Sequence, residues 1–236
     1  EAARVLKERG HEPVIYEKED HLGGTFVAAS AESYKGKLRD LLKWYIHQMD
    51  KLGIEVHLNS EIKDLSEFKN CKVIIATGAK PRVLKTPGFD KAIEACDYLL
   101  KKKEAGNKVA VIGGGLTGCE IAYELALSGK EVIIIEMKDD LISQKGVCLA
   151  NSSYLREWFA LNKTPVYLET TVKEIRDDKV ICQDKDGKTI DIPCDSVISS
   201  VGYVPSPLAN GKESGAEIVG DAEKVGNLRT VIWRAF

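Results

Sequence analysis

The chain has 236 residues, of which 44% are hydrophobic and 30% charged, a composition typical of ordinary globular proteins. Its 34 basic and 36 acidic residues give no basic excess of the kind that nucleic-acid-binding proteins show, so we expect no nucleic acid partner. The apolar runs, such as residues 109–116, are far shorter than the roughly 20 residues of a membrane span, and the charged opening does not resemble a secretory signal. We therefore expect no membrane association and a cytoplasmic location.

Six cysteines are scattered along the chain, and Cys182 and Cys194 are the closest pair. No C-x-x-C pair occurs, so we expect reduced thiols, no redox-active disulfide and no metal site within this sequence.

The first half of the chain alternates between helical and strand patterns. A helix ended by Gly10 is followed by a strand that ends at Glu17, and an amphipathic helix is ended by Gly53. The expected elements are a helix at 2–10, a strand at 14–16, a loop at 21–25, a helix at 37–52, and strands at 54–58 and 72–76.

A second alternating run begins after Pro81, Pro87 and Gly88, which indicate a crossing between domains. Its order of strand, helix and strand is typical of a parallel sheet. The expected elements are a helix at 96–103, a strand at 109–112, a helix at 117–128, a strand at 132–135, a meander of short strands at 166–168, 172–175, 180–182 and 189–192, and a strand at 197–198. Asp186-Gly187 predicts the hairpin turn of the meander.

The sequence Gly113-Gly114-Gly115-Leu116-Thr117-Gly118 follows a predicted strand and opens a predicted helix. It fits the pattern G-x-G-x-x-G, in which Gly113 allows a tight turn, Gly115 lets the backbone approach a pyrophosphate, and Gly118 lets helix and strand pack closely. The N-terminus of the helix offers unpaired N–H groups to the anion. Residues 108–136 are therefore predicted to bind a dinucleotide.

Glu136 ends the next strand, where a carboxylate can accept hydrogen bonds from the adenosine ribose of NADH. The 2′-phosphate of NADPH would be repelled there by roughly 2 to 8 kcal/mol, for charges of about −1 and −2 at about 4 Å and an effective dielectric constant between about 80 and 20. NADH is favoured, and the nearby Lys138 keeps NADPH as the alternative.

The pattern occurs twice, because Glu17 ends a strand as Glu136 does and Ala76-Thr77-Gly78 is echoed by Ser200-Val201-Gly202. Glu17 is expected to bind a second ribose. We predict an α/β protein with two Rossmann-like dinucleotide-binding domains, the second inserted in the first.

The first predicted dinucleotide-binding domain comprises residues 1–90 and 193–236, and the predicted NADH-binding domain, with its small antiparallel meander, comprises 91–192. The first strand and glycine turn of the first domain would precede residue 1, so the chain is expected to be part of a longer protein, by truncation or because upstream residues are disordered.

Several segments resemble the paired FAD and NAD(P)H domains of the flavoprotein reductases with a glutathione-reductase-like fold. These segments are Glu17-Lys18 with Leu22-Gly23-Gly24-Thr25, residues 76–82, Gly113 to Glu120, and Val219-Gly220-Asp221-Ala222. The chain is most similar to the C-terminal region of the old yellow enzyme-like NADH:flavin oxidoreductases, which include 2-enoate reductases, 2,4-dienoyl-CoA reductase and trimethylamine dehydrogenase. The likeness covers nearly the whole chain.

The resemblance implies that residues 1–90 and 193–236 form an FAD-binding domain, and it implies cofactor-binding roles for the matching residues. For FAD they are Glu17 with Lys18 at the ribose, Gly24 and Thr25 near the phosphates, Val56 at the adenine, Ala76, Thr77, Gly78 and Gly202 near the domain crossing, and Gly220 with Asp221 at the ribityl chain. For NADH they are Gly113, Gly115, Leu116 and Gly118 in the turn, Glu136 at the ribose, and Thr117 and Glu120 on the nicotinamide side.

The implied function is an NADH-oxidising electron-entry module. Hydride would pass from NADH to FAD, and electrons would continue to FMN and a [4Fe–4S] cluster in an N-terminal barrel that reduces activated C=C bonds. The barrel and the cluster ligands would lie outside this sequence, and no catalytic side chain is assigned because the protein orients the two rings. A non-catalytic ADP-binding structural module and a stand-alone NADH diaphorase remain as alternatives. The partner would be the chain's own barrel domain, and a homo-oligomer is left open.

Overall fold

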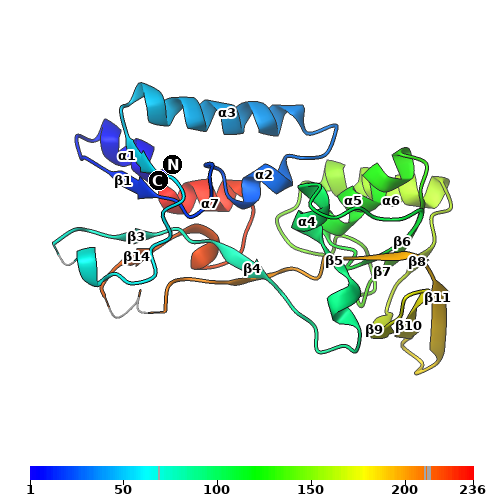
Figure 1. The fold of residues 1–236 in the computed structure, drawn as a ribbon. Helices are drawn as coiled ribbons and strands as arrows, with labels where there is room; N and C mark the ends of the chain where they lie inside the picture. Colours follow the sequence, from blue (N-terminus) through cyan, green and yellow to red (C-terminus); the bar gives the residue numbers. More distant parts are fainter. Residues whose placement is uncertain (69, 210, 212–213) are drawn as a thin grey trace. The chain divides into compact units, whose positions relative to one another are not determined.

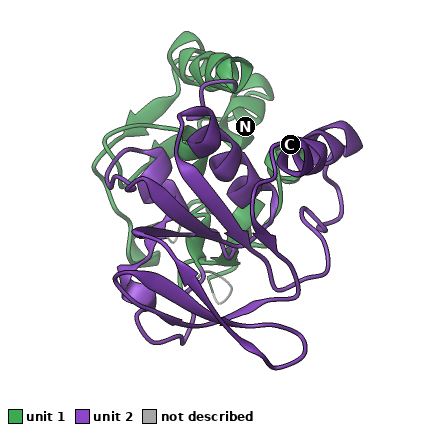
Figure 2. Ribbon diagram, turned by 90° about the vertical axis from the view of Figure 1, so that its right-hand side faces the viewer, with its two compact units in different colours: residues 1–30, 35–81, 203–236 green, residues 31–34, 82–202 purple. Residues whose placement is uncertain are grey.

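The structure, a computed structural model, describes residues 1–68, 70–209, 211 and 214–236. The chain forms two compact units, shown in Figure 2. Unit 1 contains residues 1–30, 35–81 and 203–236, and unit 2 contains residues 31–34 and 82–202.

The boundaries of these compact units differ from the expected domain boundaries at both crossings. Residues 82–90 and 193–202, which were expected in the first domain, lie in unit 2. The physical reason at the second crossing is strand pairing, because residues 196–199 form β12, which lies in parallel register with β6 of unit 2.

Unit 2 is built on a five-stranded parallel sheet with the strand order β5-β12-β6-β7-β8. Its strands are β5 (Ile93–Glu94), β6 (Lys108–Ile112), β7 (Glu131–Ile135), β8 (Val166–Tyr167) and β12 (Ser196–Ser199). The continuous apolar runs of β6 and β7 are typical of parallel strands that are covered on both faces. The parallel sheet and its helices confirm the predicted α/β fold.

Alternate residues of these strands face two different layers. Val109 and Val111 pack against the helices α4 (Ala95–Leu99), α5 (Leu116–Leu127) and α6 (Leu149–Leu161). Ala110 and Ile112 pack against a three-stranded antiparallel meander. Figure 1 shows the helices and the meander on opposite sides of the sheet.

The meander consists of β9 (Thr171–Ile175), β10 (Lys179–Gln183) and β11 (Thr189–Pro193). Asp186-Gly187 forms the turn between β10 and β11, with Gly187 at φ +82°. The meander was also expected to include residues 166–168, and this prediction was wrong. These residues contain β8, which pairs in parallel with β7 in the main sheet. Helix α6, which makes the crossover between β7 and β8, was not predicted from the sequence.

Unit 1 carries the helices α1, α2, α3 and α7, and the strands described in it pair two by two. The helices are α1 (Ala2–Glu8), α2 (Thr25–Ala29), α3 (Gly36–Lys51) and α7 (Leu228–Ala235). The parallel pairs are β1 (Val14–Tyr16) with β2 (Glu55–His57) and β3 (Ile74–Ile75) with β14 (Glu217–Ile218), and the antiparallel pair is β4 (Ala79–Pro81) with β13 (Tyr203–Pro205). Short 3-10 helices are η1 (Ser66–Phe68), η2 (Phe89–Lys91, in unit 2) and η3 (Gly220–Ala222).

The start of α7 is fixed by a reciprocal cap. Asn227 Oδ1 accepts from the Thr230 amide at 3.1 Å, and Thr230 Oγ1 accepts from the Asn227 amide at 2.9 Å. Such a capping box satisfies two amides that a helix would otherwise leave unpaired. In the described part of the chain, no helix combines the length and apolar composition needed to cross a bilayer.

Candidate functional site

The glycine turn between β6 and α5 is the centre of the candidate site in unit 2. Gly113 has φ +102°, and a Cβ atom there would lie 2.3 Å from the carbonyl oxygen of Ser200. A Cβ atom at Gly118 would lie 1.9 Å from the carbonyl oxygen of Gly113. Glycine at these two positions is therefore required by the packing of the protein itself.

Gly115 is different, because neither its backbone conformation nor its packing requires glycine. Its φ of −70° suits any residue, and the nearest described protein atom to an added Cβ, Oε1 of Gln144, is 3.4 Å away. The atoms nearest to this position all belong to the end of the flexible Gln144 side chain, and no backbone atom is among them. This geometry fits the expected approach of a pyrophosphate.

The N-terminus of α5 is also suited to an anion. Gly115 occupies the N-cap position and has no side chain to bond to the first amides, so the helix start is uncapped, and the first turn carries no acidic residue. The amides of the first turn and the positive end of the helix dipole are thus available to a phosphate group.

Glu136 lies directly after β7 and is 8% exposed. Its Oε2 accepts a hydrogen bond from the Gly114 amide at 2.6 Å, and its Oε1 accepts from the Lys138 amide at 2.9 Å. Each carboxylate oxygen can accept a further bond, so the residue can hold the turn and also receive ribose hydroxyls. The structure therefore brings Glu136 and the glycine turn together, as the sequence pattern predicts for a dinucleotide site.

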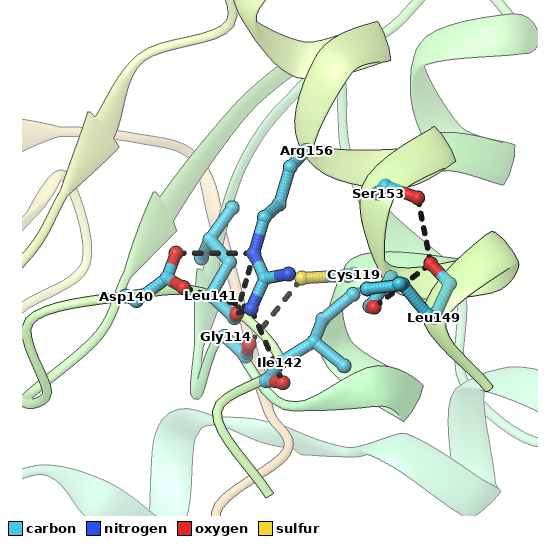
Figure 3. A network of polar contacts seen from close by, with 9 residues as sticks. Gly114, Cys119, Asp140, Leu141, Ile142, Leu149, Ser153 and Arg156 are labelled. Carbon is cyan, nitrogen blue, oxygen red and sulfur yellow. Dashed lines mark hydrogen bonds and ion pairs between the residues drawn. The ribbon is translucent and has the colours of Figure 1, made fainter. Parts of the chain in front are cut away.

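The loop after Glu136 packs on the same turn, as Figure 3 shows. The Ile142 amide donates to the Gly114 carbonyl at 2.8 Å, and Cys119 Sγ donates to the same oxygen at 3.4 Å. Ile142 has φ +51°, a conformation that costs a residue other than glycine on the order of 1–3 kcal/mol. Arg156 of α6 contacts this loop, and the sequence analysis did not single it out. Leu155 and Phe159 of α6 are buried and lie four residues apart, a helical spacing from which α6 could have been predicted.

Cys119 is a packing residue and not a nucleophile. Its side chain is fully buried, and burial, reinforced by the charges of Glu136 and Glu120, raises the pKa of its thiol to about 12. All six cysteines lie in the described part of the chain and are free thiols.

Thr117 and Glu120 lie on α5, where Thr117 is exposed and Glu120 is half-buried. The segment 31–34, which was expected in the FAD domain, packs on this helix and belongs to unit 2. Ser33 donates to Glu124 from its amide at 3.2 Å and its hydroxyl at 2.9 Å, and the ring of Tyr34 meets Tyr123 edge to face at 5.7 Å. Burial raises the pKa of Tyr34 well above its usual range, and the charge of Glu120 adds to this effect.

In unit 1, Glu17 and Val56 lie on neighbouring parallel strands, β1 and β2. Ile15 of β1 is in register with Val56 of β2, and the Glu17 amide donates to the His57 carbonyl at 2.9 Å. Glu17 Oε1 accepts from the Glu19 amide at 2.9 Å, which matches the bond between Glu136 and the Lys138 amide in unit 2. Lys18 is exposed.

A second group in unit 1 forms at one end of the parallel pair β3 and β14. The Val219 amide donates to the Ile75 carbonyl at 3.0 Å, so Gly220-Asp221 and Ala76-Thr77-Gly78 leave the two strands at the same end. Gly78 and Gly220 have φ of +74° and +62°. Thr77 Oγ1 donates to the Ser206 carbonyl at 2.9 Å, and Asp221 Oδ1 accepts from the Gly226 amide at 2.9 Å.

The remaining predicted residues lie at turns. Gly24 has φ +50° and precedes Thr25, the first residue of α2. Gly202 has φ +88° and its carbonyl accepts from the Arg82 amide at 2.9 Å within unit 2. The cofactor roles of all these residues stay predictions.

The fold and the glycine turn define an α/β protein of the dinucleotide-binding class. The chain belongs to the pyridine nucleotide-disulphide oxidoreductase family, whose sequence profile matches residues 1–226. This assignment confirms the predicted kinship with the flavin-dependent, FAD- and NAD(P)H-binding oxidoreductases.

Similar proteins support the same assignment. The chain is 36% identical to cinnamate reductase of Clostridium sporogenes over 243 residues and 30% identical to NADH oxidase of Thermoanaerobacter brockii over 253 residues; each comparison covers the whole of this chain. A solved structure of a 2-naphthoyl-CoA reductase superposes with a TM-score of 0.88 over 99% of the chain, at 29% identity. The chain spans 36%, 38% and 36%, respectively, of the lengths of these three proteins.

Proposed function

We propose that the chain is the NADH-oxidising electron-entry module of a multi-domain NADH:flavin oxidoreductase. The observation that carries the proposal is the glycine turn of unit 2, where Gly115 leaves bare backbone beside an uncapped helix N-terminus and Glu136 is bonded to the turn. Gly115 and the first turn of α5 bind the pyrophosphate of NADH, and Glu136 binds its adenosine ribose. The same carboxylate favours NADH over NADPH.

Unit 1 holds FAD through its two residue groups. Glu17 binds the ribose beside Val56, and Asp221 binds the ribityl chain beside Ala76-Thr77-Gly78. When bound, FAD supplies the acceptor for the hydride of NADH, a chemistry that no side chain provides. The protein itself binds and orients the two cofactors, so that no side chain is required as acid or base.

We further propose that the electrons leave for a barrel domain with FMN and a [4Fe–4S] cluster that reduces activated C=C bonds. The proposal draws on the two similar reductases, named for cinnamate and 2-naphthoyl-CoA, which are nearly three times as long as the region they share with this chain. The similarity to NADH oxidase favours the diaphorase, which passes electrons directly to a small acceptor, as the second candidate.

The test is an anaerobic titration of the purified chain with FAD and then with NADH. We expect FAD to bind with a visible flavin spectrum and NADH to bleach it, and NADPH to do so only at higher concentration. Glu17→Gln is expected to weaken FAD binding, whereas Glu19→Gln, a change of the same kind on an exposed neighbour, is the matched control. Binding of NADH without bleaching would favour a nucleotide-binding structural module instead.

The onward transfer is tested on the product of the complete open reading frame that encodes this chain. We expect iron, acid-labile sulfide and FMN in addition to FAD. A product that lacks all three but reduces dyes with NADH would favour the diaphorase.

A further inference from the structure

The loop that follows Glu136 forms one wall of the glycine turn. The Ile142 amide donates to the Gly114 carbonyl at 2.8 Å. A Cβ atom at Gly114 would lie 2.5 Å from Cδ2 of Leu141, and a Cβ atom at Gly115 would lie 3.4 Å from Oε1 of the Gln144 side chain. The position of the turn therefore depends on the position of residues 141–144.

Arg156 holds this loop from α6 (Figure 3). Its Nε and Nη2 donate to the Leu141 carbonyl at 3.0 and 2.5 Å, and Nη2 also lies 3.4 Å from the Ile142 carbonyl. The same two nitrogens pair with Asp140, Nε to Oδ1 at 3.1 Å and Nη2 to Oδ2 at 2.8 Å. One guanidinium thus fixes three successive residues of the loop.

The loop needs such a hold because its backbone is unfavourable. Ile142 is β-branched and has φ +51°, a conformation that such residues avoid unless their surroundings impose it. Its side chain is buried, with 4% of its surface exposed. The helix that carries Arg156 is itself fixed, because Leu155 and Phe159 are buried in the core between the sheet and its helices.

We propose that Arg156 is a positioning residue for NADH, which keeps the loop 140–144 and the glycine turn in the conformation that receives the adenosine and pyrophosphate half of the dinucleotide. Arg156 makes its contacts to the loop, not to the ligand. The inference rests on the proposed function of the turn. It extends that function to a residue distant in sequence from the glycine motif, on a helix that the motif does not include.

The test compares Arg156→Gln and Arg156→Lys with Arg176→Gln in the full chain. Arg176 is the matched control, because it also binds a carboxylate through two nitrogens, to Glu174 at 2.9 and 3.0 Å, but lies in the meander. The dissociation constants for NADH and for ADP-ribose are measured by calorimetry, and the rate of flavin reduction is measured in the FAD-loaded chain.

For Arg156→Gln we expect both dissociation constants to rise about tenfold. This rise corresponds to a loop that adopts the binding conformation in about a tenth of the molecules. The rate at saturating NADH is expected to stay unchanged. Arg156→Lys keeps the charge but not the planar fork, so an intermediate loss is expected. Reduced nicotinamide mononucleotide lacks the adenosine half, and its KM is expected to be the same in all variants.

Unchanged ADP-ribose binding in both Arg156 variants would overturn the inference, and so would an equal loss for reduced nicotinamide mononucleotide, which would indicate a general structural role. If Arg156→Gln does not fold, Arg156→Lys alone decides between these outcomes. Failure of the unaltered chain to bind either NADH or ADP-ribose would instead refute the proposed function itself.

Discussion

The glycines of the turn offer a direct test of which positions serve the fold and which serve the ligand. Gly115→Ala adds a methyl group that meets no described protein atom closer than 3.4 Å, at a backbone φ of −70° that alanine accepts. Alanine is a poorer helix cap than glycine, at a cost below about 1 kcal/mol, but it restricts the unfolded chain by about 0.4–1 kcal/mol. The free energy of unfolding is therefore expected to change by less than about 0.5 kcal/mol.

Binding of NADH is expected to change much more. The added methyl group lies where the pyrophosphate is expected to contact the backbone, and a hydrogen bond to a charged group contributes roughly 1.5–3 kcal/mol. At about 1.4 kcal/mol for each factor of ten, the loss of one such bond raises the dissociation constant for NADH by about 10- to 100-fold. Calorimetric titration with NADH and urea unfolding measure the two effects separately.

Gly118→Ala is the control with the opposite expectation. Its methyl group would lie 1.9 Å from the Gly113 carbonyl oxygen, so the turn must shift at a cost of about 1–3 kcal/mol of stability. If Gly115→Ala bound NADH as tightly as the unaltered chain, or lost as much stability as Gly118→Ala, the assignment of Gly115 to the ligand would be refuted.

Three further predictions concern single side chains. Glu136→Gln removes the charge that opposes a 2′-phosphate, so the ratio of the NADPH to the NADH dissociation constant should fall about 30-fold, for about 2 kcal/mol of repulsion removed; an unchanged ratio would contradict the specificity argument. In the folded chain at pH 8, the exposed Cys71 and Cys148 should react with a thiol reagent, whereas the buried Cys119, with its pKa raised to about 12, should react only after unfolding, as peptide mass mapping can show. The Lys108 and Asn107 amides lower the pKa of Asp195 below its ordinary 3.8, so the stability this carboxylate contributes is present above that value and lost as the pH falls through the folded pKa. Asp195→Asn should therefore be less stable at neutral pH, and unfolding curves of the two proteins should converge in acid.

Local patterns were sufficient to predict the NADH-type unit. The glycine spacing, the apolar strands at 109–112 and 132–135 and the terminal Glu136 all depend on residues close in sequence, and β6, α5 and β7 form where they were expected. The bond between Glu136 and the Gly114 amide follows from this unit, because parallel neighbours end at the same edge of the sheet.

Pairing between distant residues was not predictable from such patterns. The strand 166–168 carries no mark that distinguishes a meander from a parallel sheet, and only its register with β7 decides this. The same holds for residues 31–34, whose place in unit 2 depends on contacts of Ser33 and Tyr34 with α5. The boundary of unit 2 after β11 differs from the expected one for a similar reason, because β12 pairs with β6.

The sequence by itself thus determined the strand, glycine turn and helix of the candidate nucleotide site, since a turn, a helix start and a strand end are local structures set by residue type and spacing. Only the tertiary structure decided which glycines the protein needs for its own packing and which it leaves bare, because that distinction depends on atoms such as the Ser200 carbonyl that lie far away in the chain. It also decided that Arg156 reaches the loop beside the turn, since a hydrogen bond between residues 15 positions apart, here Arg156 to the Leu141 carbonyl, has no signature in the sequence.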